Sequence, residues 1–143
     1  MSEGKKEILL GDCLELMKDI PNGSIDMILC DLPYGIIQSK WDVPIPFDNL
    51  WEQYNRIIKP NGAVVLFGNE PFSSGLRFSN ISNWKYDWIW DKKNKTGILN
   101  CKKRPLKQFE NIMVFYKEQC VYNPQMTKGK FRNKKITTKK VFD

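Results

Sequence analysis

The sequence predicts an α/β fold, with a mostly parallel sheet that ends in an antiparallel hairpin. Two short apolar runs, 26–30 and 63–67, have the length and composition of buried parallel strands. Between them, 48–59 has apolar residues at helical spacing on one face. Aromatic and other residues alternate over 84–90, as in a strand, and most of these rings are expected to face the core. No crossover helix separates this segment from the apolar run 111–116, so the two strands should pair antiparallel.

An apolar triplet and a capping pattern predict the N-terminal elements. Ile8-Leu9-Leu10 is expected to be a short strand. Asp12 is placed to cap a helix over Cys13–Ile20, and Glu15 at the third helical position would complete a capping box. The turn signal Pro21-Asn22-Gly23-Ser24 separates this helix from the strand that follows.

The middle of the chain predicts two further helices and two loops. Gly35–Pro46 is polar and contains proline, so it should be a loop. The helix over Asp48–Lys59 should end at Pro60-Asn61-Gly62, and a short helix is expected over Ser73–Ser82. Lys92–Gln108 lacks hydrophobic periodicity and predicts a long loop, where functional contacts usually lie.

A loop suited to holding an amino group follows the first buried strand. Asp31-Leu32-Pro33-Tyr34 comes directly after that run, and ligands of open α/β sheets bind beyond the carboxyl ends of strands. The exocyclic amine of adenine or cytosine is a poor nucleophile because its lone pair is delocalised into the ring. The carboxylate of Asp31 and the backbone carbonyl of Leu32 can accept its two N–H groups, while Pro33 restricts the loop and Tyr34 offers a stacking face. Taken alone, these four residues fit a plain strand-ending turn equally well.

Together with its surroundings, the loop resembles that of the amino-methylating DNA methyltransferases, which act on adenine N6 or cytosine N4. The family loop is Asp/Asn/Ser-Pro-Pro-Tyr, and Leu32 stands here in place of the first proline. An aspartate at the first position is more typical of adenine enzymes. Further similar segments are Leu9-Leu10-Gly11-Asp12-Cys13, Trp41-Asp42, Leu66-Phe67-Gly68-Asn69-Glu70-Pro71-Phe72 and Glu110-Asn111-Ile112-Met113-Val114-Phe115-Tyr116-Lys117.

The resemblance implies a Rossmann-like methyltransferase sheet, S-adenosylmethionine as methyl donor and a base flipped from double-stranded DNA as acceptor. It implies that Asp31, Leu32, Pro33 and Tyr34 are catalytic. It also implies that Gly11, Asp12 and Cys13 lie with Asp31 beside the donor. Helix capping by Asp12 and a small buried thiol at Cys13 are the plain structural alternatives. Trp41, Asp42 and Glu70 are weaker candidates, which packing and structural hydrogen bonds explain equally well.

The sequence contains no match to one family feature, a Phe-x-Gly-x-Gly loop that holds the donor. In the permuted subgroup that loop lies C-terminal to the Asp-Pro-Pro-Tyr half, so the chain resembles the first half of such an enzyme, with a fold incomplete at its C-terminal half. Residues 1–120 would be the catalytic half, and 121–143 a basic segment that begins a target-recognition region. A truncated gene, an expression fragment or a split enzyme would each look this way.

Charge is distributed unevenly along the chain. Residues 1–91 carry 8 basic and 13 acidic side chains, whereas 92–143 carry 15 basic and 3 acidic ones, within a net charge of +7. This asymmetry predicts a face that binds a polyanion such as DNA. The first basic cluster consists of Lys92, Lys93, Lys95, Lys102, Lys103, Arg104 and Lys107. The second, which could equally be a solvated tail, consists of Lys128, Lys130, Arg132, Lys134, Lys135, Lys139 and Lys140.

Composition excludes several classes of protein. Without histidine the chain has no histidine-based triad, and its four separated cysteines predict reduced, mostly buried thiols and no zinc site. No apolar stretch approaches the ~20 residues that span a membrane, and the N-terminus lacks the apolar region of a signal peptide, so we expect a cytoplasmic protein without membrane contact.

Three further hypotheses stay open at the level of sequence. The chain could be a catalytically incomplete DNA-binding remnant or one subunit of a split methyltransferase. RNA could replace DNA as the substrate. A second polypeptide or a second copy of the chain could complete the donor site, because an uncovered sheet edge favours pairing.

Overall fold

The computed structural model describes residues 6–35, 39 and 42–129, which form one four-stranded sheet and three α-helices. In chain order the elements are α1 (Cys13–Met17), β1 (Ile25–Asp31), α2 (Phe47–Ile57), β2 (Ile58–Gly68), α3 (Phe72–Ser79), β3 (Trp84–Thr96), the 3₁₀ helix η1 (Ile98–Asn100) and β4 (Lys107–Phe115).

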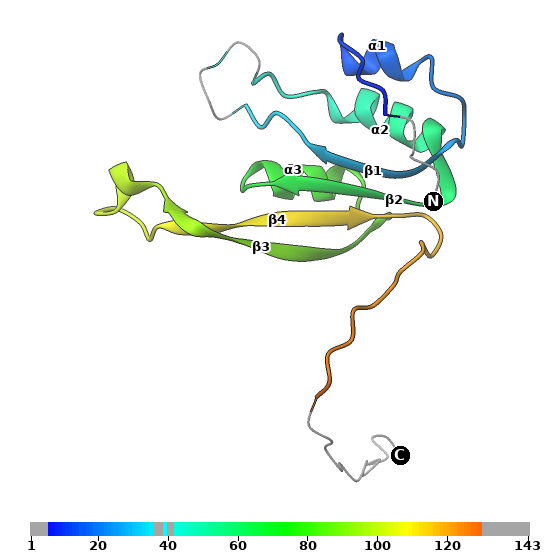
Figure 1. Ribbon diagram of the computed structural model, residues 1–143. Helices are drawn as coiled ribbons and strands as arrows, with labels where there is room; N and C mark the ends of the chain where they lie inside the picture. The colour runs from blue at the N-terminus through cyan, green and yellow to red at the C-terminus, as the bar shows by residue number, and fades with distance from the viewer. Residues whose placement is uncertain (1–5, 36–38, 40–41, 130–143) are drawn as a thin grey trace, which may run out of the picture.

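The strands are ordered β1-β2-β4-β3 (Figure 1). β1 and β2 are parallel, with Asp31 opposite Phe67, whereas β4 lies antiparallel to both β2 and β3. The predicted antiparallel pairing of the last two strands is thus confirmed. Because β4 lies between β2 and β3 and is antiparallel to both, β1, β2 and β3 all run in the same direction. Their carboxyl ends therefore lie at one edge of the sheet.

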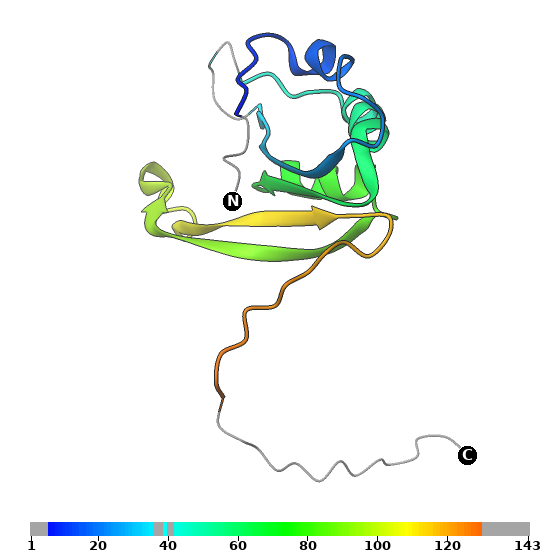
Figure 2. The same cartoon turned by 45° about the vertical axis from the view of Figure 1, so that its right-hand side comes forward.

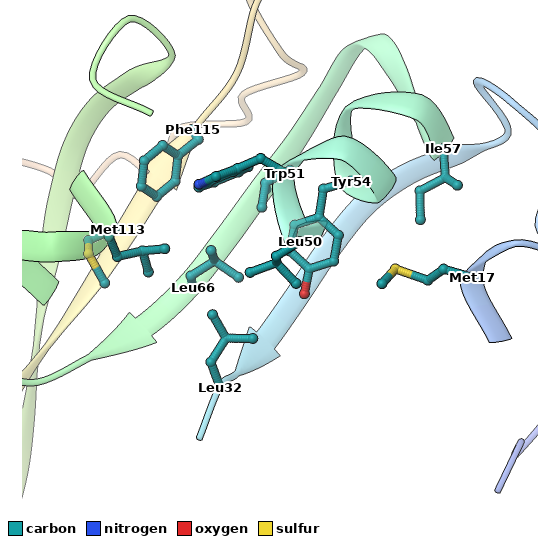
Figure 3. Packing of buried hydrophobic residues seen from close by; sticks show 11 residues of the cluster. Met17, Leu32, Leu50, Trp51, Tyr54, Ile57, Leu66, Met113 and Phe115 are labelled. Atoms are coloured by element: carbon teal, nitrogen blue, oxygen red, sulfur yellow. The ribbon is translucent and has the colours of Figure 1, made fainter. Parts of the chain in front are cut away.

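One face of the sheet carries the hydrophobic core. Leu50 and Trp51 of α2 pack with Leu66 of β2 and with Met113 and Phe115 of β4 (Figure 3). The rings of Trp51 and Phe115 lie 4.9 Å apart between their centroids. Residues of α1 and α3 join the same cluster, so all three helices of the described chain serve this one face.

The opposite face of the sheet exposes large apolar side chains. Met27 and Leu29 of β1 are 56% and 59% exposed, and Trp88 and Trp90 of β3 are 47% and 46% exposed. An irregularity of register between Trp84 and Tyr86 explains why the aromatic rings of β3 lie on different faces of the sheet. It leaves Trp84 against the core and turns the later rings of the alternating series to the other face. The expectation that most of these rings face the core is therefore wrong.

At the N-terminus, the predicted helix cap at Asp12 is confirmed, and the predicted strand Ile8-Leu9-Leu10 is wrong. Asp12 Oδ1 accepts the backbone N–H groups of Leu14 at 2.8 Å and Glu15 at 3.4 Å. The Glu15 carboxylate bonds Lys18 at 2.7 Å, so the reciprocal capping bond is replaced by an ion pair. Ile8-Leu9-Leu10 forms no strand and is 58% exposed or more, because it pairs with none of the four strands of the described sheet.

The helices α1 and α3 end three residues earlier than predicted, at Met17 and Ser79. Two other boundaries differ because strands pair where the sequence predicts a helix end or a loop. Pro60-Asn61-Gly62 lies inside β2, and the register shift between Ile25 and Met27 of β1 accommodates it. The predicted loop Lys92–Gln108 is shorter, since β3 continues to Thr96, which pairs with Lys107. The two strands thus form a hairpin arm, residues 91–109, that projects past the end of β2 (Figures 1 and 2).

Candidate active-site loop

Asp31 is the last residue of β1, and its side chain is exposed at the carboxyl edge of the sheet. The hydroxyl of Tyr34 donates a hydrogen bond to Asp31 Oδ1 at 2.5 Å. Within the residues that the structure describes, Asp31 Oδ2 accepts no hydrogen bond. Tyr34 therefore holds one oxygen of this exposed carboxylate, and the second oxygen is left for another donor.

Tyr34 is half-buried against α3. Its ring lies 4.9 Å from that of Phe72, centroid to centroid, and Phe72 in turn packs on Phe47 at 5.6 Å. Burial, and then the hydrogen bond to Asp31, raise the pKa of the Tyr34 hydroxyl well above its ordinary value. The phenol consequently stays neutral and acts as a donor to Asp31.

Both flanks of the loop are fixed. The Leu32 side chain is 5% exposed and belongs to the core cluster (Figure 3). At the other flank Gly35 adopts φ +68°, and a Cβ there would lie 2.6 Å from the Pro44 ring, so only glycine fits. The buried carboxylate of Asp42 accepts the Gly35 N–H at 3.0 Å. Asp42 is thus a structural tie, and Trp41, its predicted companion, lies outside the described residues.

A polar cluster joins the end of β2 to the hairpin arm. The carboxylate of Glu110 accepts hydrogen bonds from Asn69 Nδ2 at 3.1 Å and from Lys92 Nζ at 2.5 Å. Lys107 Nζ donates to Asn69 Oδ1. The charge of Glu110 is a minor contribution to the raised pKa of Tyr34, after burial and Asp31. Two of the seven candidate DNA-binding cations, Lys92 and Lys107, are therefore engaged within the protein.

Sequence reasoning did not identify Asn69 and Glu110 as partners of these lysines. Their separation along the chain is 41 residues, and only the pairing of β2 with β4 brings them together. A single carboxylate in an otherwise basic segment was the one signal that could have indicated an internal ion pair.

Glu70 has a structural role at the start of α3. Its carboxylate accepts the Ser74 N–H at 3.1 Å, the Ser74 hydroxyl at 2.6 Å and an Arg77 N–H at 3.0 Å. These bonds, those of Ser74 foremost, lower the pKa of Glu70 to about 2. Arg77 also donates to Asp87 at 2.6 Å, which connects α3 to β3.

The three predicted donor-binding residues, Gly11, Asp12 and Cys13, are all exposed. Burial is the first cause that raises the pKa of the Cys30 thiol, which lies one residue before Asp31. The expectation of a buried Cys13 is wrong, as is that of mostly buried thiols, since Cys101 is exposed too and Cys30 and Cys120 are partly exposed.

The remaining five cations of the first cluster are exposed on the hairpin arm. They are Lys93, Lys95, Lys102, Lys103 and Arg104.

Among the helices that the structure describes, none is long and apolar enough to cross a membrane.

No family model matches the chain. In sequence it is similar to the Type II methyltransferase M.HinfI of Haemophilus influenzae, with 30% identity over 113 residues that cover 61% of this chain and 32% of that protein. It is also similar to the Type II methyltransferase M.BamHI of Bacillus amyloliquefaciens, with 27% identity over 90 residues that cover 52% of this chain and 21% of that protein. The chain thus spans a third or less of the length of these relatives.

Solved structures share the fold. The PvuII DNA methyltransferase (cytosine-N4-specific) superposes with a TM-score of 0.60 and 19% identity, covering 78% of this chain and 49% of that one. The M1.HpyAVI–SAM complex gives a TM-score of 0.57 and 23% identity, covering 85% and 62% of the two chains. TTHA0409 of Thermus thermophilus, complexed with S-adenosyl-L-methionine, gives a TM-score of 0.57 and 16% identity, covering 81% and 57%. These likenesses confirm the predicted Rossmann-like methyltransferase class of fold.

Proposed function

We propose, from its sequence similarity to two Type II methyltransferases and its methyltransferase class of fold, that this chain carries the base-binding half of an amino-methylating DNA methyltransferase. The reaction would move a methyl group from S-adenosylmethionine to the exocyclic amine of a flipped base. The observation that carries the proposal is the exposed Asp31 carboxylate at the end of β1, where Tyr34 donates to one oxygen and no described residue donates to the other.

Each group of the loop has a separate task in this proposal. Asp31 Oδ2 and the Leu32 carbonyl accept the two N–H groups of the target amine, which draws the nitrogen toward a tetrahedral, nucleophilic geometry. Tyr34 holds Asp31 Oδ1 and, on the side away from Phe72, supports the flipped base. Pro33 and the buried Leu32 side chain limit the motion of the loop.

The exposed residues near the start of α1 fit the adenosine part of the donor. S-adenosylmethionine, when bound, supplies an electrophilic methyl group. We propose that Gly11, Asp12 and Cys13 line its adenosine, with Asp31 at the methyl end. The Asp12 carboxylate already caps α1 through Oδ1, so its other oxygen would take a ribose or adenine group.

Adenine N6 is the preferred target in this proposal, because aspartate occupies the first position of the loop, and cytosine N4 is the alternative. The acceptor would be double-stranded DNA, with its phosphates on Lys93, Lys95, Lys102, Lys103 and Arg104. Lys92 and Lys107 would hold the arm in place through Glu110 and Asn69.

We assign residues 1–120 to the catalytic half and 121–143 to the beginning of a target-recognition region. We propose that the protein acts in the cytoplasm, where its DNA lies.

We further propose that a second polypeptide, or a second copy of this chain, completes the donor site. The apolar face with Met27, Leu29, Trp88 and Trp90 supports this, since exposed apolar patches commonly mark an interface.

Methyl transfer and DNA retention, measured side by side, test the function. Asp31→Ala should abolish transfer of a labelled methyl group to duplex DNA while duplex binding is kept, and Asp42→Asn serves as the folding control. Equal loss of both activities would reduce Asp31 to a folding role.

Calorimetric titration with S-adenosylmethionine separates the two forms of the proposal. Heat of binding with this chain alone supports a self-sufficient donor site, and binding only after a glycine-loop polypeptide is added supports a split enzyme. If the chain binds duplex DNA but no donor in either experiment, the second candidate is favoured, a DNA-binding remnant. The five exposed cations of the arm support this candidate. Transfer to RNA in place of DNA would contradict the proposed substrate.

A further inference from the structure

We propose that the tip of the hairpin arm, residues 97–101, is an apolar wedge that enters the base stack of double-stranded DNA through Ile98 and Leu99. This inference rests on the proposed function only in taking DNA as the partner. It assigns a separate task, opening of the duplex, to residues away from the active-site loop.

The arm holds its tip well clear of the rest of the protein. β2 ends at Gly68, opposite Asn111, whereas β3 and β4 continue to pair as far as Thr96 and Lys107. Gly97 then turns the chain at φ +89°, and a Cβ there would meet no atom within 4 Å. Figures 1 and 2 show the tip projecting beyond the carboxyl ends of β1 and β2, the edge that bears Asp31.

Folding does not explain the two apolar side chains at this tip. Leu99 is 99% exposed and Ile98 is 69% exposed, so neither packs on the core. Two adjacent aliphatic side chains at the end of a protruding hairpin are costly in water unless a partner covers them.

The charge around the tip selects the partner. Lys95, Lys102, Lys103 and Arg104 are exposed on both sides of Ile98 and Leu99, and no carboxylate occurs between Asp91 and Glu110. A polyanion with an apolar interior matches this pattern, and DNA is one: phosphates outside and stacked bases inside. Leucine and isoleucine are among the side chains that proteins insert between base steps to unstack them. Two apolar residues are too few to hold a membrane surface.

The base of the arm is fixed, as a wedge requires. Lys92 bonds Glu110 at 2.5 Å, Gln108 bonds Asp91 at 2.8 Å, and Thr96 Oγ1 donates to the Lys107 carbonyl at 3.2 Å. These bonds span β3 and β4, so they hold the arm at its base against the sheet.

The test uses the 143-residue chain and a duplex that carries 2-aminopurine, whose fluorescence rises when the base unstacks. The test variant is Ile98→Ser with Leu99→Ser, and the matched control is Ile98→Val with Leu99→Met, which keeps the apolar character. We expect a fluorescence rise with the unchanged chain and the control, and none with the serine variant. The serine variant should bind an intact duplex about tenfold more weakly, but a duplex with an abasic gap as well as the unchanged chain does.

Salt dependence separates the wedge from the phosphate contacts. The slope of log affinity against log salt should be the same for the serine variant and the unchanged chain, because no cation is lost. Since both residues are exposed, the unfolding midpoint should be unchanged, and Leu99→Ser alone provides a milder variant. A change of sedimentation coefficient in place of a change in unstacking would identify the tip as a self-association surface and overturn the proposal.

Failure of the wedge and failure of the proposed function differ in outcome. Duplex binding without a fluorescence rise, or an equal rise with the serine variant, overturns the wedge alone. A rise that depends on the tip, in a chain that transfers no methyl group with any second polypeptide, overturns the methyltransferase alone. Absence of duplex binding overturns both.

Discussion

The buried carboxylate of Asp42 accepts a hydrogen bond from the backbone N–H of Gly35 at 3.0 Å, and this bond closes the far flank of the active-site loop. Asp42→Ala should lower the free energy of unfolding by about 1.5–3 kcal/mol, because a hydrogen bond to a charged, buried carboxylate is lost. Asp42→Asn keeps an acceptor oxygen and should recover part of this loss. Urea unfolding followed by tryptophan fluorescence measures both, and equal stability of the alanine and asparagine variants would contradict the assignment.

Tyr34→Phe tests the bond that orients Asp31. The variant keeps the ring contact with Phe72 but removes the donor to Asp31 Oδ1, so the carboxylate can rotate. We expect methyl transfer, in the completed enzyme, to slow by about tenfold or more, the effect of losing one hydrogen bond to a charged group. Single-turnover kinetics at saturating DNA measure this. An unchanged rate would mean that Asp31 needs no such support.

Glu70 makes stability depend on pH in acid solution. Its pKa falls from an ordinary 4.5 to about 2 on folding, so the folded state favours the charged form. The stabilising contribution is complete above pH 4.5 and is lost as the pH falls toward 2. As the pH is lowered between these limits, the thermal unfolding midpoint should fall less for Glu70→Gln than for the unchanged chain. Parallel declines would assign the acid sensitivity to other carboxylates.

Lys92 and Lys103 should respond differently to neutralisation. Lys92→Gln removes a partner of the largely buried Glu110 and should destabilise the fold, with little effect on the salt dependence of DNA binding. Lys103 is exposed on the arm, so Lys103→Gln should leave stability unchanged. It should reduce the slope of log DNA affinity against log salt concentration by about 1. Fluorescence anisotropy at several salt concentrations distinguishes the two. A reversal of the pattern would move the DNA contact to Lys92.

Interactions between near neighbours were predictable from the sequence. The Asp12 cap lies within three residues of its donors, and the strand ends at Asp31 and Gly68 follow from short apolar runs bounded by turn residues. Such features depend on local spacing, which the sequence displays directly.

Features that depend on distant partners were not predictable. The arm continues to Thr96 because Lys107 pairs with it across the hairpin, although neither strand has an apolar face there. Ile8-Leu9-Leu10 has the composition of a strand and lacks a neighbour to pair with in the described sheet. The inward position of Lys92 required Glu110, 18 residues away, which charge counting alone treats as a minor exception.

The bare face of the sheet also has a practical consequence. Side chains of the size of Met27, Leu29, Trp88 and Trp90, exposed on one face of a sheet, adhere to other apolar surfaces when the concentration is high. Expression on its own should therefore drive the chain into inclusion bodies or onto chaperones. Co-expression with a partner that covers this face should return the chain to the supernatant, so recovery of dissolved protein is a simple screen for such a partner.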